Sequence, residues 1–200
     1  MKEWPCYHTT LDVFSAADME AGIVGCAVGA PFAVLVAEEL FASGCRLLIS
    51  ISSAGQIVAA GAAPYFVVID RALRDEGTSY HYAPPAEFAV ADAALVNLAV
   101  SALRTSGISA IVGASWTTDA PFRETAEAIV HARGKGILAV EMEAAALYTF
   151  AKAANVKILC IAHVTNTMAQ TEGDFEKGEA DGATDALRLL EAIARSGLPV

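Results

Sequence analysis

Two glutamates flank a methionine where an apolar, strand-like run passes into an alanine-rich helix, in the segment Val140-Glu141-Met142-Glu143-Ala144. A glutamate is poorly suited to a core here, because burying an unpaired carboxylate is costly. Its two oxygens could instead accept hydrogen bonds from a neighbouring diol, such as the 2′- and 3′-hydroxyls of a ribose. The alternative is a solvated acidic pair in the first turn of a helix, where the helix dipole favours negative charge.

Two segments of small residues could expose backbone N–H groups to an anion or to a sugar hydroxyl. They are residues 25–29 (Gly-Cys-Ala-Val-Gly) and residues 52–55 (Ser-Ser-Ala-Gly), and both finish or follow apolar runs typical of strands. Plain turns would have a similar composition, so this pattern alone leaves both interpretations open.

Two further polar segments could face a flat ring. Phe122 and Arg123 lie after a predicted strand, beside Thr118 and Asp119, either of which could simply cap the next helix. Asn166 follows the last predicted strand, and its amide can donate to one ring atom and accept from another. An asparagine in this place is also a common turn former. Because ligands gather at the carboxyl ends of strands in helix-covered sheets, we expect these segments to meet there.

Helix and strand signals alternate along the chain. Strands are expected over residues 46–51, 65–70, 109–115, 137–140 and 156–164, and helices over 31–43, 91–105, 123–132, 142–154 and 183–194. Residues 22–28 form a short apolar run, and residues 74–82 read as a polar loop. Uniformly apolar strands separated by helices indicate an α/β protein whose sheet is covered on both faces.

Composition limits the classes of protein and partner. A chain of 200 residues, 55% hydrophobic and 18% charged, favours one domain with a large core and some apolar surface covered by another subunit. The net charge of −10 argues against a nucleic acid or an anionic membrane as partner. A small anion remains possible, because a few fixed dipoles can hold it inside an acidic protein.

The cysteines and histidines show no spacing that indicates a metal site or a disulfide framework. We expect the cysteines to be small buried hydrophobic residues in a reducing compartment, and the histidines to be structural. The sequence has no leader-like start and no apolar run long enough to span a membrane, so a cytoplasmic location is expected. The cysteines meant here are Cys6, Cys26, Cys45 and Cys160, and the histidines are His81, His131 and His163.

Taken in order, these motifs resemble those of the nucleoside phosphorylase family, which includes purine nucleoside and uridine phosphorylases and related nucleosidases. The stretch 140–149 (VEMEAAALYT) is the most specific of them, and residues 76–82 look most like the uridine phosphorylase branch. The resemblance runs from about residue 21 to the end. It rests on residues 24–29, 52–55, 75–79, 118–124, 140–143 and 164–166.

The resemblance implies a three-layer α/β/α sandwich around a mixed, partly barrel-like central sheet. It implies one domain over residues 1–200, of which residues 1–20 are an atypical N-terminal segment. Members of the family assemble as homo-oligomers, here expected to be a dimer or a trimer of dimers. Their partners are a small-molecule nucleoside and phosphate, and phosphate is a co-substrate, so no cofactor and no metal are expected.

The family transfers a ribosyl group from a nucleobase to phosphate. By resemblance, Glu143 would bind the ribose hydroxyls, with Met142 beneath the sugar, and Phe122 would lie against the base. Asn166 would hold a ring atom of the base. An asparagine there suits a 6-oxopurine or a pyrimidine, whereas an aspartate can protonate a 6-aminopurine. Glu143 and Asn166 would be catalytic, and the substrate-binding set would be Glu141, Met142, Glu143, Phe122, Arg123 and Asn166.

The phosphate site implied by the resemblance comprises Gly25, Gly29 and Ser53. Family members usually begin with a strand and a Gly-Asp-Pro-like segment followed by an arginine, and nothing similar precedes residue 22. They also carry an arginine three residues before the position of Ser53, where this chain has Ser50. Arg46 lies at the other end of the predicted strand, about 13 Å from Ser50 at roughly 3.3 Å per residue.

Four alternatives follow from these departures. Backbone dipoles could bind phosphate weakly, a neighbouring subunit could supply the positive charge, or water could replace phosphate as the nucleophile. In the last case the protein would be a nucleosidase, although Asn166 cannot act as the general acid that such enzymes place there. The fourth alternative is a nucleoside-binding protein with weak or no catalysis.

Overall fold

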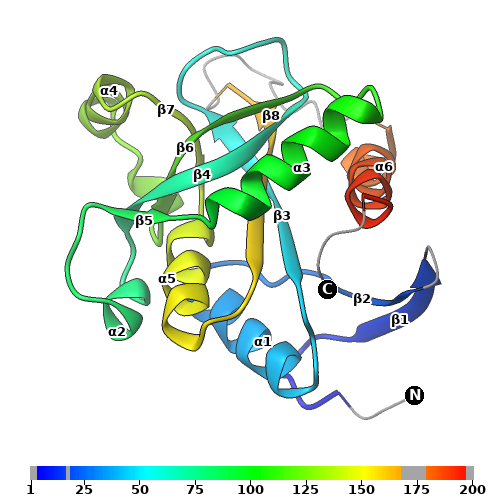
Figure 1. The fold of residues 1–200 in the computed structure, drawn as a ribbon. Helices are drawn as coiled ribbons and strands as arrows, with labels where there is room; N and C mark the ends of the chain where they lie inside the picture. The colour runs from blue at the N-terminus through cyan, green and yellow to red at the C-terminus, as the bar shows by residue number, and fades with distance from the viewer. Residues whose placement is uncertain (1–3, 17–18, 168–178, 197–200) are drawn as a thin grey trace.

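A mixed β-sheet curls into a barrel at the centre of the computed structural model, which describes residues 4–16, 19–167 and 179–196 (Figure 1). The strand order is β5-β4-β6-β7-β3-β8, and a further pairing between β4 and β8 closes five of the strands into a ring. Of the six strands of this sheet, β5 lies outside the ring and pairs with β4. The strands are β3 (Leu48–Gln56), β4 (Tyr65–Asp75), β5 (Phe88–Val90), β6 (Ala110–Thr118), β7 (Ile137–Glu141) and β8 (Ile158–Asn166).

The strands of the ring run in two directions. Strands β4, β6 and β7 are parallel to one another, and β3 is parallel to β8. The pairs β3–β7 and β4–β8, which join the two groups, are antiparallel. The carboxyl ends of β4, β6 and β7 therefore point opposite to those of β3 and β8. The sheet is thus mixed rather than uniformly parallel, yet the carboxyl ends of β3, β7 and β8 still lie together, because Gly55 pairs with both Val140 and Asn166.

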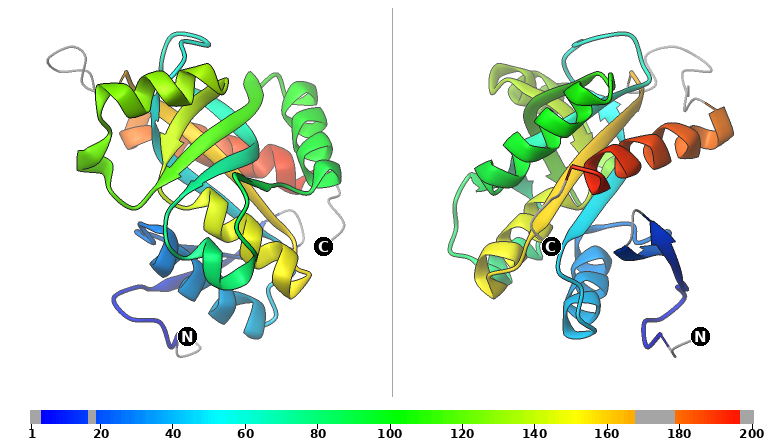
Figure 2. Two further views of the ribbon diagram at one scale, coloured as in Figure 1. Left: turned by 90° about the vertical axis from the view of Figure 1, so that its left-hand side faces the viewer. Right: turned by 45° about the vertical axis from the view of Figure 1, so that its right-hand side comes forward.

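Helices cover the barrel on two sides (Figures 1 and 2). Helices α1 (Ala30–Ala42) and α5 (Ala144–Ala154) pack against one set of buried strand residues, and α3 (Ala93–Thr105) and α6 (Ala183–Ala194) against another. Helix α4 (Ala126–Gly134) covers β7 and the end of β6. The short helix α2 (Ser79–Tyr82) follows β4. This arrangement confirms the predicted α/β class with a mixed, barrel-like central sheet.

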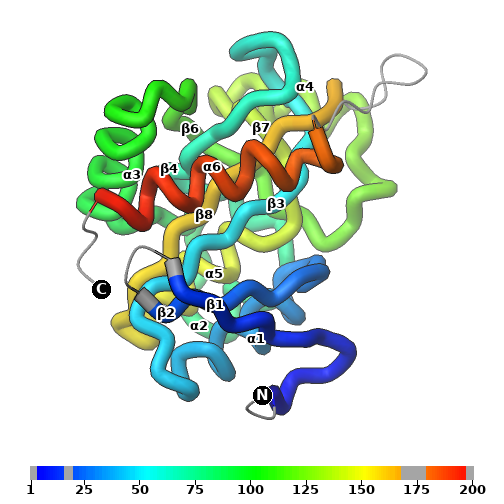
Figure 3. The backbone as a smooth tube through the Cα atoms, turned by 90° about the vertical axis from the view of Figure 1, so that its right-hand side faces the viewer, coloured from blue at the N-terminus to red at the C-terminus, as the bar shows by residue number. Residues whose placement is uncertain are grey.

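An N-terminal hairpin lies outside the barrel, on the side of α1 (Figure 3). Strands β1 (Leu11–Ala16) and β2 (Met19–Val24) pair with each other in antiparallel register, as a separate two-stranded sheet. Val13, Phe14 and Ile23 are exposed. The sequence predicted only a short apolar run in this region, because the apolar residues of the hairpin do not alternate cleanly with polar ones.

Most predicted elements are present with shifted ends. Strand β4 continues to Asp75, into the segment expected to be a loop, because it pairs with β6 as far as Thr118. Helix α4 begins at Ala126, where Thr125 caps it by accepting a hydrogen bond from the Ala128 N–H at 3.3 Å. Strand β5 has only three residues and was not predicted. No helix among the described residues is long and apolar enough to cross a membrane.

The hydroxyl of Tyr148 bridges the two strands that close the barrel, at the point where they separate. The β4–β8 pairing ends at Val68 and Ile161. One residue further on, the buried Tyr148 hydroxyl donates to the Ile69 carbonyl at 2.7 Å and accepts from the Cys160 N–H at 3.0 Å. A side chain from α5 thus provides hydrogen-bond partners for two backbone groups that lie beyond the end of the β4–β8 pairing.

We expect Tyr148→Phe to lower the free energy of unfolding by about 1–3 kcal/mol, because it leaves two buried backbone groups without partners. Chemical denaturation measures this change, with an unaltered dependence on denaturant as evidence that the fold is kept. Tyr7→Phe, at an exposed position, is the matched control and should be neutral. Equal effects of the two changes would show that the bridge contributes nothing.

Candidate active site

Glu143 joins the first turns of two helices. Its buried carboxylate lies at the start of α5, and Oε1 accepts a hydrogen bond from the N–H of Gly29, the N-cap residue of α1, at 2.7 Å. Oε2 accepts from the N–H of Met142 at 3.3 Å. Burial raises the pKa of Glu143, and the hydrogen bonds from Gly29, Met142 and the Ser52 hydroxyl oppose that rise. The positive ends of both helix dipoles favour an anion at this point.

The loop before α1 presents the Gly29 N–H to this carboxylate. Gly29 has φ +90°, a conformation that L side chains rarely adopt, while a Cβ would find no atom within 4 Å. The backbone conformation rather than a lack of space therefore calls for glycine here. Cys26 also has a positive φ of 60°, and its carbonyl accepts from the Val28 N–H at 3.0 Å. Gly25 lies in the same loop and is exposed.

Glu141 holds the neighbouring strands and helix together with four hydrogen bonds. Its Oε1 accepts from the hydroxyls of Ser115 at 3.0 Å and Thr117 at 2.5 Å. Its Oε2 accepts from the backbone N–H groups of Glu143 and Ala144, both at 2.7 Å. Glu141 therefore caps α5 from the last position of β7, which explains why that helix begins at Ala144 rather than at Met142 as predicted.

Burial, and secondarily the charge of Glu143, raise the pKa of Glu141 to about 7, although its hydrogen bonds to Thr117, Glu143 and Ala144 oppose the rise. Among the described residues, the ion pairs involve neither glutamate. The desolvation of two adjacent carboxylates is therefore compensated by N–H and O–H dipoles rather than by a cation.

Ser53 and Asn166 belong to a second group, centred on Thr165. Ser53 Oγ lies 2.9 Å from Thr165 Oγ1, and the Asn166 amide Nδ2 donates to the same oxygen at 3.5 Å. Successive residues of a strand point to opposite faces. Ser52 is the serine that bonds to Glu143, and its neighbour Ser53 turns toward β8. The structure thus places Glu143 with Gly29, and Ser53 with Asn166.

The two groups are linked through β3. Gly55 pairs with Asn166 on one side and with Val140 on the other. Asn166 therefore lies across a single strand from the segment that carries both glutamates. Met142, which stands between the two glutamates in the sequence, is half-buried.

Phe122 and Arg123 follow the end of β6, the strand whose Ser115 and Thr117 hold Glu141. They lie in the short 3-10 turn η1 (Pro121–Arg123) after β6. The side chain of Phe122 is fully exposed and that of Arg123 is exposed as well. Their role in contacting a base stays a prediction.

Three side chains of this region were not recognised in the sequence as members of a site. Ser115 and Thr117 hold Glu141, and Thr165 contacts both Ser53 and Asn166. Their signal is a hydroxyl within an otherwise apolar, fully buried strand, where a polar side chain needs a partner. Ser52 carried no separate signal, because it stands in a run of small residues.

Two of the four cysteines are buried as expected, whereas His81 and His131 are exposed, so that their structural role stays a prediction. Cys6 and Cys160 are buried, Cys45 is half-buried, and all four cysteines are free. Cys26 is exposed, so its prediction as a buried residue was wrong. The buried His163 stacks on Phe66 with ring centroids 4.5 Å apart, and its burial lowers the pKa. In the described part of the chain, no three His, Cys, Asp or Glu side chains are placed to hold a metal ion.

We expect Glu141→Gln to remove one part of the pH dependence of stability. The pKa of Glu141 is raised above its ordinary value in the folded protein, so the native state binds more protons than the unfolded state between pH 4.5 and 7. This contribution to stability is present below about pH 4.5 and is lost as the pH rises to about 7, by on the order of 3 kcal/mol. A glutamine cannot titrate, yet its amide can donate to Ser115 and Thr117 and accept from both backbone N–H groups.

Denaturation midpoints between pH 5 and 8 test this expectation. The wild-type midpoint should fall more steeply with pH than that of Glu141→Gln. Glu20→Gln, an exposed change with the same loss of formal charge, should keep the wild-type slope. Identical slopes in all three proteins would mean that Glu141 is already ionised across this range.

Comparison with known proteins shows the family of this chain. A relative named guanosine phosphorylase, from Halorubrum lacusprofundi, is 25% identical over 174 residues, which cover 83% of this chain and 72% of the relative. The family model described as "Phosphorylase superfamily" matches residues 2–195. Glu141 at the end of β7, Glu143 at the start of α5 and the glycine loop that bonds to Glu143 thus lie within the matched region. The chain belongs to the phosphorylase superfamily.

Proposed function

We propose that the protein is a nucleoside phosphorylase that cleaves the N-glycosidic bond of uridine or a 6-oxopurine nucleoside, with phosphate as acceptor. The observation that carries this proposal is the environment of Glu143. Its two oxygens accept three hydrogen bonds, from the Gly29 and Met142 N–H groups and from the Ser52 hydroxyl, and a carboxylate can accept about four. The remaining acceptor capacity suits the 2′- or 3′-hydroxyl of a ribose.

The proposed reaction follows from the charge that develops. As the bond from C1′ to the base nitrogen breaks, its electron pair goes to the base and the sugar becomes oxocarbenium-like. A phosphate oxygen then forms the new bond to C1′. The carboxylate of Glu143 and the phosphate anion stabilise this cation more than the neutral nucleoside, which lowers the barrier. The Asn166 amide would donate a hydrogen bond to the electron-rich base.

Phosphate, the proposed acceptor, would need a positive group in the site. Ser50 lies on β3 where the resemblance calls for an arginine, and Arg46 is exposed and precedes that strand. The remaining candidates for holding phosphate are the hydroxyl of Ser53 and the loop from Gly25 to Gly29. Because position 50 is a serine rather than an arginine, a second candidate is a nucleosidase, in which water attacks C1′ in place of phosphate. A nucleoside-binding protein without catalysis is the third.

One assay separates the three candidates. The protein is incubated with inosine, guanosine, uridine or adenosine, with and without phosphate, and the free base is measured. We expect base release that requires phosphate and saturates only at high phosphate concentration, because no arginine stands at position 50. Release without phosphate would identify a nucleosidase. Thermal stabilisation by a nucleoside without any release would identify a binding protein.

We expect Glu143→Gln to reduce turnover or nucleoside affinity at least tenfold, since a charge-assisted hydrogen bond contributes roughly 1.5–3 kcal/mol. The melting temperature should change little, because the glutamine oxygen can still accept from Gly29. Kinetics and calorimetric titration with the preferred nucleoside measure the first effect, and thermal denaturation the second. Glu20→Gln is the control for a lost charge. Unaltered binding with a lower melting temperature would assign Glu143 a purely structural role.

We expect Asn166 to determine the choice of base. Its Nδ2 donates to Thr165 Oγ1, and an amide held in this orientation presents its donor and acceptor in fixed places, which can match the edge of a 6-oxopurine or of uracil; adenine carries its donor and acceptor in exchanged places and would need the amide reversed. A mismatch leaves polar groups unpaired on both partners, so inosine, guanosine or uridine should be preferred over adenosine. Asn166→Asp should shift the ratio of kcat/KM values toward adenosine. An unchanged ratio in that variant would show that this residue does not read the base.

A further inference from the structure

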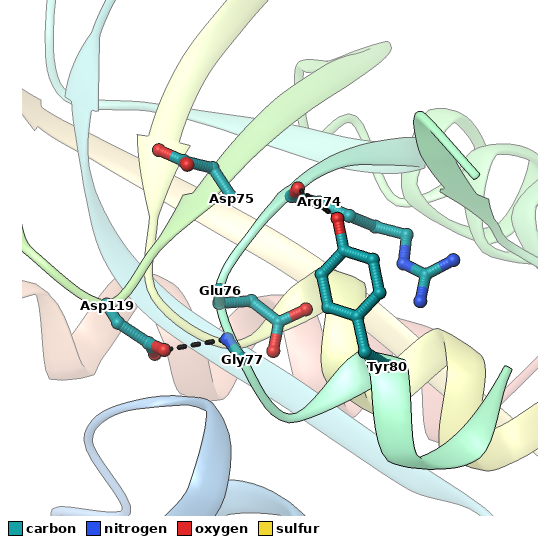
Figure 4. A pocket seen from close by; sticks show the side chains of 6 residues that line it. All are labelled: Arg74, Asp75, Glu76, Gly77, Tyr80 and Asp119. Carbon is teal, nitrogen blue, oxygen red and sulfur yellow. Dashed lines mark hydrogen bonds between the residues drawn. The ribbon is translucent and has the colours of Figure 1, made fainter. Parts of the chain in front are cut away.

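A second polar pocket lies where β4 and β6 end, and none of the proposed site residues lines it (Figure 4). It has a volume of about 290 Å³ and is open to solvent. Its floor comes from the segment that links β4 to α2, and Asp119 closes one side from the end of β6. The lining residues are Arg74, Asp75, Glu76, Gly77, Tyr80 and Asp119.

Arg74, the cation among the described residues of this pocket, already donates hydrogen bonds to uncharged oxygen atoms. Arg74 is buried, and its Nε donates to Ser79 Oγ at 2.9 Å. Its Nη1 and Nη2 donate to the carbonyls of Pro84 at 2.7 Å and Ala83 at 3.2 Å. The guanidinium carbon also lies 4.3 Å from the centroid of the Tyr80 ring. Arg74 therefore fixes the loop and does not pair with the carboxylates of the pocket.

Three carboxylates remain, which gives the lining a formal charge of −2 when Arg74 is counted. Two of them are held in place by one donor each. Asp75 Oδ2 accepts from the Trp116 indole N–H at 2.9 Å, and Asp119 Oδ2 accepts from the Gly77 N–H at 2.8 Å. Each carboxylate keeps acceptor capacity for a further donor. The acceptors are thus oriented before any ligand arrives.

Glu76 is the observation that points to a ligand. Only 5% of this residue is exposed, and its Oε2 accepts from the Ser79 N–H at 2.9 Å. Its Oε1 is buried and has no hydrogen-bond partner. Figure 4 shows the carboxylate between Gly77 and Tyr80, among the residues that line the pocket. A buried carboxylate oxygen without a donor is costly, and a ligand that brings an N–H group would remove that cost.

We propose that this pocket binds a small organic cation through its N–H groups, a guanidinium or a primary ammonium. An anion is disfavoured because Arg74, the cation among the described lining residues, donates to carbonyl and hydroxyl oxygens. A bare metal ion fits poorly, because the carboxylates are not grouped closely enough to coordinate one within the described residues. A planar cation with several N–H donors can reach separated acceptors at once. The net charge of −10 further favours the approach of cations.

Calorimetric titration with butylguanidinium at low ionic strength tests the proposal, with butylurea as an uncharged probe of similar shape. We expect saturable binding of the cation, weakened by added salt, and no binding of butylurea. Glu76→Gln should weaken binding about tenfold or more, because the pairing with the buried carboxylate is charge-assisted. Asp119→Asn should weaken it about threefold, since that carboxylate is exposed. The asparagine can still accept from Gly77, so the loop is kept.

Three controls make the result decisive. Gly77→Ala changes no charge, and its Cβ would lie 3.7 Å from Asp119 Oδ2, so it occupies space at the pocket and should weaken binding. Asp12→Asn removes one negative charge on the distant hairpin and should leave binding unchanged. Glu143→Gln should also leave it unchanged, which separates this pocket from the nucleoside site whether or not that site is active. Equal affinity for butylurea, no saturable binding, or binding indifferent to Glu76→Gln, Asp119→Asn and Gly77→Ala would overturn the proposal.

Discussion

The carboxylate of Glu141 is the contact on which the rest of the site depends. It is buried where β6, β7 and α5 meet. Its four hydrogen bonds come from two hydroxyl side chains of β6 and from two backbone N–H groups at the start of α5. Helix α5 has no side-chain cap of its own at Glu143. Without Glu141, the start of that helix would lose its acceptor, and Ser115 and Thr117 would become buried hydroxyls with one partner fewer.

The position of Glu143 follows from this anchor. Because the Glu143 N–H is bound to Glu141, the backbone at position 143 is fixed, and the side chain can reach only the groups around the start of α5. Gly29 lies there because its positive φ turns the chain into α1. Two glutamates two residues apart thus have different tasks: Glu141 is enclosed by donors from its own protein, whereas Glu143 keeps acceptor capacity that a ligand could use. Desolvation raises the pKa of both, and it raises that of the fully enclosed Glu141 to about 7.

The sequence was a good guide where local pattern and tertiary structure agree. Helix α6 has the predicted bounds, Ala183–Ala194, and the apolar runs became the strands of the barrel. The glutamates were recognised as unusual because a charge beside a buried strand needs a reason. The direction of each strand could not be predicted from its own residues, since parallel and antiparallel neighbours in a covered sheet are equally apolar. Nor could the sequence separate Ser52 from Ser53, because their faces are decided by the pairing of β3 with β8.

The antiparallel contact between β3 and β7 has a mechanical consequence. Only two residue pairs, Gly55 with Val140 and Gln56 with Ala139, join these strands in register, and the N–H groups of Ile57 and Val58 extend the contact to the Leu138 carbonyl. By contrast, β3 pairs with β8 along almost its whole length. Asn166 is therefore held by β3, whereas Glu143 is held at the junction of β7 and α5. The spacing between these two side chains thus depends on the shortest pairing in the ring, that of β3 with β7.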